Sequence, residues 1–147
     1  MNRANKNEVF TEVVLEIFKL GGLLINEGDQ LTEEYGITSA RWKVLGAITL
    51  ANSPQTVPQI ARTMGLTRQA VQRLVDVMYE EELLEFQPNP EHKKAKLVSL
   101  TNKGVNIYSK LDKKQVKWAR ENSLNLTKKD LETTLSVLKK ISRQFEP

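Results

Sequence analysis

Apolar residues recur at helical spacing through the first quarter of the chain. The segment contains no proline, so the spacing predicts one long first helix. Further apolar side chains fall on its other faces, and a helix that is apolar on several sides is usually buried on several sides. In a chain of 147 residues, we expect a second subunit to cover those faces. The regularly spaced residues are Phe10, Val13, Val14, Ile17, Leu20, Leu24 and Leu31, and those on other faces are Leu15, Phe18, Leu23 and Ile25.

Three further helices are predicted before residue 82. The break at Tyr35-Gly36-Ile37 is followed by Thr38 and Ser39, either of which can cap a second helix. Thr56-Val57-Pro58-Gln59 has the form of a capping box, which starts a third helix, and Gly65 ends it because glycine readily adopts the left-handed conformation. Thr67 is the N-cap candidate for a fourth helix. The apolar faces hold Trp42, Leu45 and Ile48 in the second helix and Val71, Leu74, Val75 and Met78 in the fourth.

After Leu83 the pattern changes to short extended segments. Leu84 to Phe86 and Ala95 to Leu100 flank the turn-rich link from Gln87 to Lys94, which predicts a hairpin with a basic tip. Thr101 and Thr127 then cap a fifth and a sixth helix. The expected fold is mainly α, an α+β winged helix with six helices and a two-stranded β-wing between the fourth and the fifth. The last two helices carry Val105, Tyr108, Leu111 and Trp118, and Leu131, Leu135, Leu138, Ile141 and Phe145, respectively.

The third and fourth helices have the spacing of a helix-turn-helix, a motif whose second helix enters the major groove of DNA. Glycine lies at the turn, and Ala61 is small where the second helix crosses above it. Seven positions agree in register, counted from Val57: Ile60, Ala61, Met64, Gly65, Leu66, Val71 and Leu74. This agreement predicts that residues 57–82 form a DNA-reading unit.

The polar face of the fourth helix has the chemistry to read bases. Arginine can bond guanine and glutamine can bond adenine in bidentate fashion, so Arg68, Gln69, Gln72 and Arg73 are the candidates for contacts with base edges. Thr67 and the helix N-terminus are expected to hold a phosphate. The alternative for each residue alone is a solvated helix face.

The hairpin tip carries a second set of candidates. Lys93, Lys94 and Lys96 can contact phosphates or enter the minor groove, and His92 is expected to contact phosphate or solvent. A lysine-rich solvated turn is the alternative.

Composition narrows the possible chemistry. Cysteine is absent and His92 is the only histidine, so neither a disulfide nor a thiolate or histidine-rich metal site can be built, and we expect no metal or cofactor. Up to Gly36 there are three basic and seven acidic residues, a net charge of −4, so that the rest of the chain carries +8. The positive net charge of the chain after Gly36 suits a polyanionic partner. The polar N-terminus has no apolar signal core, so we expect a cytoplasmic protein.

The order of elements and the run from His92 to Gly104, HKKAKLVSLTNKG, resemble the MarR (multiple antibiotic resistance regulator) family. The resemblance implies a homodimer assembled through residues 1–36 and 102–147, with a winged helix-turn-helix DNA-binding region at 37–101 in a single domain of 147 residues. It also implies binding to a pseudo-palindromic operator. Many relatives carry Asp-x-Arg at the wing tip where this chain has Asn89 and Glu91, so a lysine, Lys93 or Lys94, is expected to take over that contact.

The expected function is sequence-specific binding of double-stranded DNA by a transcriptional repressor. The resemblance further implies a small aromatic or phenolic effector that relieves repression, with Trp42, Met78 and Tyr108 as candidates for its pocket, although ordinary core packing is the alternative for all three. A winged-helix protein-interaction module without DNA binding is the alternative function. No nucleotide-binding, hydrolase or metal motif occurs in the sequence, so we do not expect an enzyme.

Overall fold

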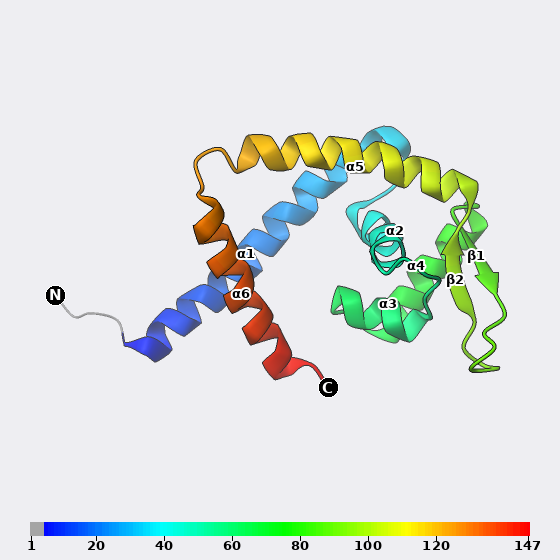
Figure 1. Cartoon of the computed structure of the whole chain (residues 1–147), viewed down its shortest axis with the longest axis horizontal. Coiled ribbons are helices and arrows are strands. Elements are labelled where there is room, and N and C mark those ends of the chain that lie inside the picture. The colour runs from blue at the N-terminus through cyan, green and yellow to red at the C-terminus, as the bar shows by residue number, and fades with distance from the viewer. Residues whose placement is uncertain (1–4) are drawn as a thin grey trace. The chain divides into compact units, whose positions relative to one another are not determined.

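The structure is a computed structural model that describes residues 5–147. Over these residues it contains six α-helices, one short 3₁₀ helix and one two-stranded sheet, in the order expected for a winged helix (Figure 1). The elements are α1 (Lys6–Thr32), η1 (Glu33–Tyr35), α2 (Ser39–Leu50), α3 (Val57–Met64), α4 (Arg68–Glu80), β1 (Leu84–Gln87), β2 (Leu97–Leu100), α5 (Asn102–Asn122) and α6 (Lys128–Phe145).

Threonine hydroxyls cap most of the helices, as the sequence predicts. Thr38, rather than Ser39, caps α2, because its Oγ1 accepts a hydrogen bond from the N–H of Arg41 at 3.3 Å. The capping box of α3 is complete: the N–H of Gln59 donates to Thr56 Oγ1 at 3.3 Å, and the N–H of Thr56 donates to Gln59 Oε1 at 2.9 Å. Such bonds satisfy N–H groups that have no partner within the helix.

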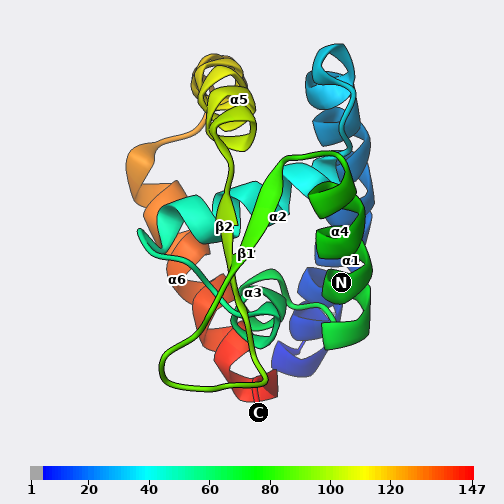
Figure 2. The same ribbon diagram turned by 90° about the vertical axis from the view of Figure 1, so that its right-hand side faces the viewer.

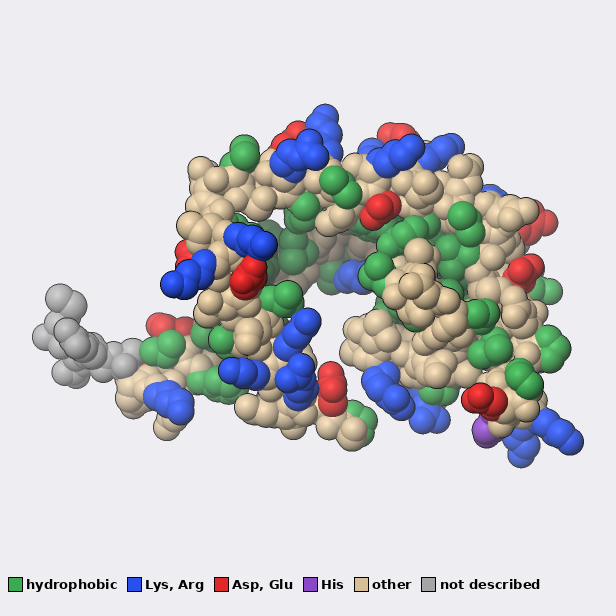
Figure 3. Space-filling model, in the orientation of Figure 1, with side chains coloured by type: hydrophobic (Ala, Val, Ile, Leu, Met, Phe, Trp, Pro, Cys, Tyr) green, Lys and Arg blue, Asp and Glu red, His purple; other side chains and the backbone are tan. Residues whose placement is uncertain are grey.

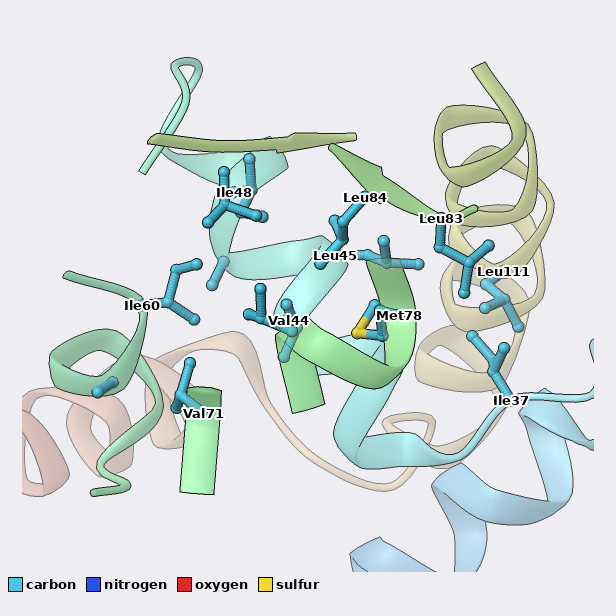
Figure 4. Close-up of a cluster of buried hydrophobic side chains, with 14 residues drawn as sticks. Ile37, Val44, Leu45, Ile48, Ile60, Val71, Met78, Leu83, Leu84 and Leu111 are labelled. Atoms are coloured by element: carbon cyan, nitrogen blue, oxygen red, sulfur yellow. The ribbon is translucent and has the colours of Figure 1, made fainter. Parts of the chain in front are cut away.

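The core of the winged-helix region forms around α2 (Figure 4). The sequence predicts one apolar face on this helix, but the structure buries Val44 and Ala47 in addition to Leu45 and Ile48, while Trp42 stays half-buried at the edge of the core. This helix is therefore enclosed on more than one side. The buried residues contributed by the other elements are Ile37, Ile60, Ala61, Val71, Val75, Met78, Leu83, Leu84, Val98 and Leu111.

The wing is an antiparallel pair in which Leu84 faces Leu100 and Gln87 faces Leu97 (Figure 2). Its second strand begins at Leu97, two residues later than predicted, so Ala95 and Lys96 belong to the connecting loop. Gln55, two residues before the start of α3, also pairs with the sheet. The N–H of Gln55 donates to the carbonyl of Val98 at 3.0 Å, and the N–H of Val98 donates back at 2.7 Å. The wing is thus fixed to the start of the helix-turn-helix.

The chain divides into two compact units, residues up to Leu111 and residues from Asp112 onward. The complete winged helix lies in the first unit, together with α1. Gly28 of α1 meets α2 closely, since a Cβ built on it would lie 2.7 Å from Ser39 Cβ, and Asp29 Oδ1 accepts a hydrogen bond from the N–H of Ser39 at 2.8 Å. Among residues 5–147, no helix has the length and apolar character that a membrane span requires.

Candidate nucleic-acid interface

The turn between α3 and α4 sets the direction of the exposed helix. Gly65 has a φ of 68°, in the left-handed region that favours glycine, and the N–H of Leu66 donates to the carbonyl of Ala61 at 3.0 Å. Thr67 Oγ1 then accepts a hydrogen bond from the N–H of Ala70 at 3.1 Å. Ala61 is buried, as a close approach of α3 and α4 requires. The predicted helix-turn-helix is therefore present.

The outer face of α4 presents the four side chains predicted to read bases. Arg68, Gln69, Gln72 and Arg73 are all exposed, while Val71 on the opposite face is fully buried. Within the described part of the chain, no carboxylate pairs with either arginine. Both guanidinium groups therefore keep their five N–H donors for an anionic or hydrogen-bonding partner.

Gln72 has a partner on its own helix. Its Nε2 donates a hydrogen bond to Oδ1 of Asp76, one turn further along α4, at 2.9 Å. Both residues are exposed, so the bond orients a side chain on the surface. Asp76 is an acidic group that follows the basic and amide-bearing residues of this face along α4.

One aromatic contact joins the first strand of the wing to α4. The rings of Tyr79 and Phe86 have centroids 5.1 Å apart and are tilted by 43°. Lys96 lies diagonally across the hairpin from Phe86, and its Nζ is 5.8 Å from the centroid of that ring. A cation held over an aromatic face gains attraction from the ring quadrupole. Phe86 thus restricts where the ammonium of Lys96 lies.

The tip of the wing is a tight turn built on Asn89. Its Oδ1 accepts a hydrogen bond from the N–H of Glu91 at 3.0 Å, and its carbonyl accepts one from the N–H of His92 at 3.3 Å. An Asx turn of this kind is typical of Asp and Asn alike. The structure therefore gives Asn89 a role in shaping the turn, and leaves His92, Lys93 and Lys94 exposed.

A groove of about 510 Å³ runs between the helix-turn-helix and the wing. Three of the four predicted base-reading residues of α4 line one side, and Lys94 and Lys96 line the other. Figure 3 shows Lys and Arg side chains at the free end of the wing and along the neighbouring edge of the helix-turn-helix. The groove is lined by Val57, Pro58, Arg68, Gln69, Gln72, Phe86, Lys94, Ala95 and Lys96.

The other predicted residues lie near the groove or away from it. Lys93 lines a neighbouring hollow of about 380 Å³ with Lys96 and Phe86, and Arg73 is exposed on α4 outside both hollows. The three residues predicted for an effector pocket belong to the core region: Met78 is fully buried, and Trp42 and Tyr108 pack partly buried against it. Their role in binding an effector stays a prediction.

Sequence reasoning missed the role of two residues, one that lines the groove and one that contacts a residue lining it. Phe86 is recognisable in the sequence only as a strand residue, because its contacts with Tyr79 and Lys96 depend on the strand register. Asp76 appears in the sequence as one more polar residue of α4. Its spacing of four residues from Gln72 is the signal for a side-chain pair on a helix.

Known proteins resemble this chain in sequence and in fold. Residues 35–95 match the model of the MarR family. A protein of Mycobacterium tuberculosis described as uncharacterized is 32% identical over 110 residues, covering 75% of this chain and 76% of the relative. A MarR/EmrR family transcriptional regulator from Acinetobacter superimposes with a TM-score of 0.82 at 20% identity, covering 92% of this chain and 96% of that one.

One of the similar solved structures is a complex with DNA. A mutant of MarR from E. coli in complex with operator DNA is 27% identical and superimposes with a TM-score of 0.69, covering 87% of this chain and 94% of the mutant. The sequence match and the structural similarity therefore point to the same family. The chain belongs to the MarR family of winged helix-turn-helix transcriptional regulators.

Proposed function

We propose that this chain regulates transcription as a homodimer that binds a pseudo-palindromic site in double-stranded DNA. The observation that carries the proposal is the groove itself. It brings Arg68, Gln69 and Gln72 of α4 to face Lys94 and Lys96 of the wing, and no carboxylate among its lining residues neutralises these cations. A helix with arginine and glutamine side chains beside a lysine-bearing loop suits a duplex, in which base edges lie between phosphate strands.

The two sides of the groove have different tasks. The side chains of α4 form directional hydrogen bonds, so they read the base edges of the major groove. The lysines of the wing neutralise phosphates and add affinity for any sequence. Thr67 can serve the first phosphate at the helix N-terminus, because its Oγ1 accepts from Ala70 and its O–H remains able to donate.

The second copy of the chain covers the apolar faces of α1 and α6. Phe18 of α1 and Phe145 of α6 are each 74% exposed in the single chain, and they belong to apolar sets that extend along both helices. Apolar patches of such length are rare on monomers. The charges also suit association, since α1 has two basic and five acidic residues, whereas α6 has five basic and two acidic. Residues 1–36 and 102–147 are therefore assigned to the dimer, and 37–101 to DNA.

The dimer has a direct test in solution. The wild type is expected to have twice the 16.8 kDa mass of one chain in sedimentation equilibrium. Phe18→Glu should lower the mass toward that of one chain, because it buries a charge in the interface. Leu50→Glu is a matched control, since Leu50 is 79% exposed and lies on α2 outside the proposed dimer region. Equal masses for Phe18→Glu and the wild type would contradict this interface.

DNA binding is tested by selection of bound duplexes from a random pool with the full chain. We expect enrichment of a pseudo-palindrome whose half-sites are separated by about one helical turn of DNA, roughly 10 base pairs between centres. A folded, dimeric protein that enriches no sequence and binds duplex no better than a neutral protein would contradict the proposal. That outcome would favour the alternative of a protein-interaction module.

A further inference from the structure

The hydrogen bond between Gln72 and Asp76 bears on how the helix reads DNA. Gln72 lines the groove between α4 and the wing, whereas Asp76 lies one turn beyond the lining residues. The amide of Gln72 is therefore hydrogen-bonded to the carboxylate of Asp76, which does not itself line the groove. This contact uses one N–H of the amide and leaves the other N–H and both lone pairs of Oε1 for a further partner.

A carboxylate fixes the orientation of an amide because it only accepts hydrogen bonds. The Nε2 end of Gln72 must face Asp76, since the Oε1 end would be repelled by it. The bidentate contact of glutamine with adenine uses Oε1 and the N–H beside it, which accept from N6 and donate to N7. Both of these groups stay available when Asp76 accepts from the N–H that points away from Oε1.

We propose that Asp76 is a positioning residue that presets the Gln72 amide for adenine and so sets the base preference at the position that Gln72 reads. The inference rests on the proposed function, because it concerns one contact within that interface. Asp76 also carries a negative charge on a surface that meets phosphates, which opposes binding to every duplex. Asp76 therefore raises selectivity while it lowers overall affinity.

Two substitutions separate these effects. Asp76→Asn removes the charge and keeps the shape, but asparagine both donates and accepts, so it holds either end of the Gln72 amide. We expect adenine selectivity to fall about three- to tenfold at one position, while affinity for random duplex rises about two- to threefold. Glu80→Gln is the matched control: Glu80 is also an exposed acid on α4, so it should reproduce the rise in affinity without the loss of selectivity.

Gln72→Ala first identifies the base pair that Gln72 reads, as the position at which this variant loses its base preference. The experiment then measures the affinity of the full chain for the selected duplex and for the three duplexes that carry the other base pairs at that position. Wild type, Asp76→Asn, Gln72→Ala and the double variant form a cycle, with thermal unfolding to verify that each variant is folded. Asp76→Asn should change selectivity only when Gln72 is present. The same change in the Gln72→Ala background would overturn the proposal, and so would unaltered selectivity in Asp76→Asn. If the wild type has no base preference anywhere, the proposed function itself is wrong.

Discussion

Removing the two lysines of the groove should change how DNA binding depends on salt. Lys94 and Lys96 are the cations of the groove that are assigned to phosphate, so a dimer offers four of them to the DNA backbone. Each phosphate neutralised by a cation adds about −0.9 to the slope of log affinity against log salt concentration, which gives about −3.6 from these four lysines. The double variant Lys94→Gln, Lys96→Gln removes these four charges and should shift the slope by about 3.6. Other cations add the same amount to both slopes.

The size of this effect makes it easy to measure. From these four lysines alone, a fourfold rise in NaCl lowers the affinity of the wild type about 150-fold more than that of the double variant. Fluorescence anisotropy with a labelled duplex at five salt concentrations measures both slopes. Lys110→Gln, Lys113→Gln removes two exposed lysines of α5 as a control and should keep the wild-type slope. Equal slopes for all three proteins would refute the assignment of the wing lysines to phosphate.

Three stability predictions are tested together by urea unfolding. A Cβ on Gly104 would clash with the carbonyl oxygen of Leu83, so Gly104→Ala should destabilise the fold by about 1–3 kcal/mol, and an unchanged midpoint would contradict this contact. Glu82 has a φ of 63°, so Glu82→Gly should stabilise the fold by about 1 kcal/mol through relief of the left-handed conformation, and a loss of stability would count against it. Thr56→Ala removes the cap that serves the N–H of Gln59 and should cost about 1 kcal/mol, whereas no loss would mean that the capping box is dispensable.

Local signals predicted the helix-turn-helix well. Thr56, Gln59, Gly65 and Thr67 each act within a few residues of their own position, so the chemistry of a cap or a left-handed turn is readable in the sequence. The same logic predicts the break at Gly36, which has a φ of 69°. Motifs of this kind predicted the third and fourth helices, and with them the face that carries the candidate site.

Contacts between distant segments were not predictable in the same way. The pairing of Gln55 with Val98 and the approach of Gly104 to Leu83 depend on how the sheet and α5 pack against the core. The position of Lys96 over Phe86 depends on strand register, which no residue near Lys96 specifies. These three-dimensional contacts place the wing beside α4 and so create the groove.

The first helix was predicted in part: its extent followed from the sequence pattern, but its start did not. Its length was predicted from the apolar spacing, but its start at Lys6 lies before the first apolar residue that was counted. The reason is a capping box in which the N–H of Glu8 donates to Asn5 Oδ1 at 2.9 Å and the N–H of Asn5 donates to Glu8 Oε2 at 3.1 Å. Asparagine serves here as the N-cap of a capping box, a motif in which serine or threonine is the usual residue.

The most direct test of DNA reading by α4 is the affinity of an Arg68→Glu, Arg73→Glu variant for the duplex selected by the wild type. The reversal places negative charge on the exposed face of α4, where no carboxylate of the described residues pairs with either arginine. We expect the variant to keep the dimeric mass and the thermal stability of the wild type while its affinity for the selected duplex falls to or below that for random DNA. A folded dimer that binds the selected duplex as tightly as the wild type does would contradict the claim that α4 reads DNA.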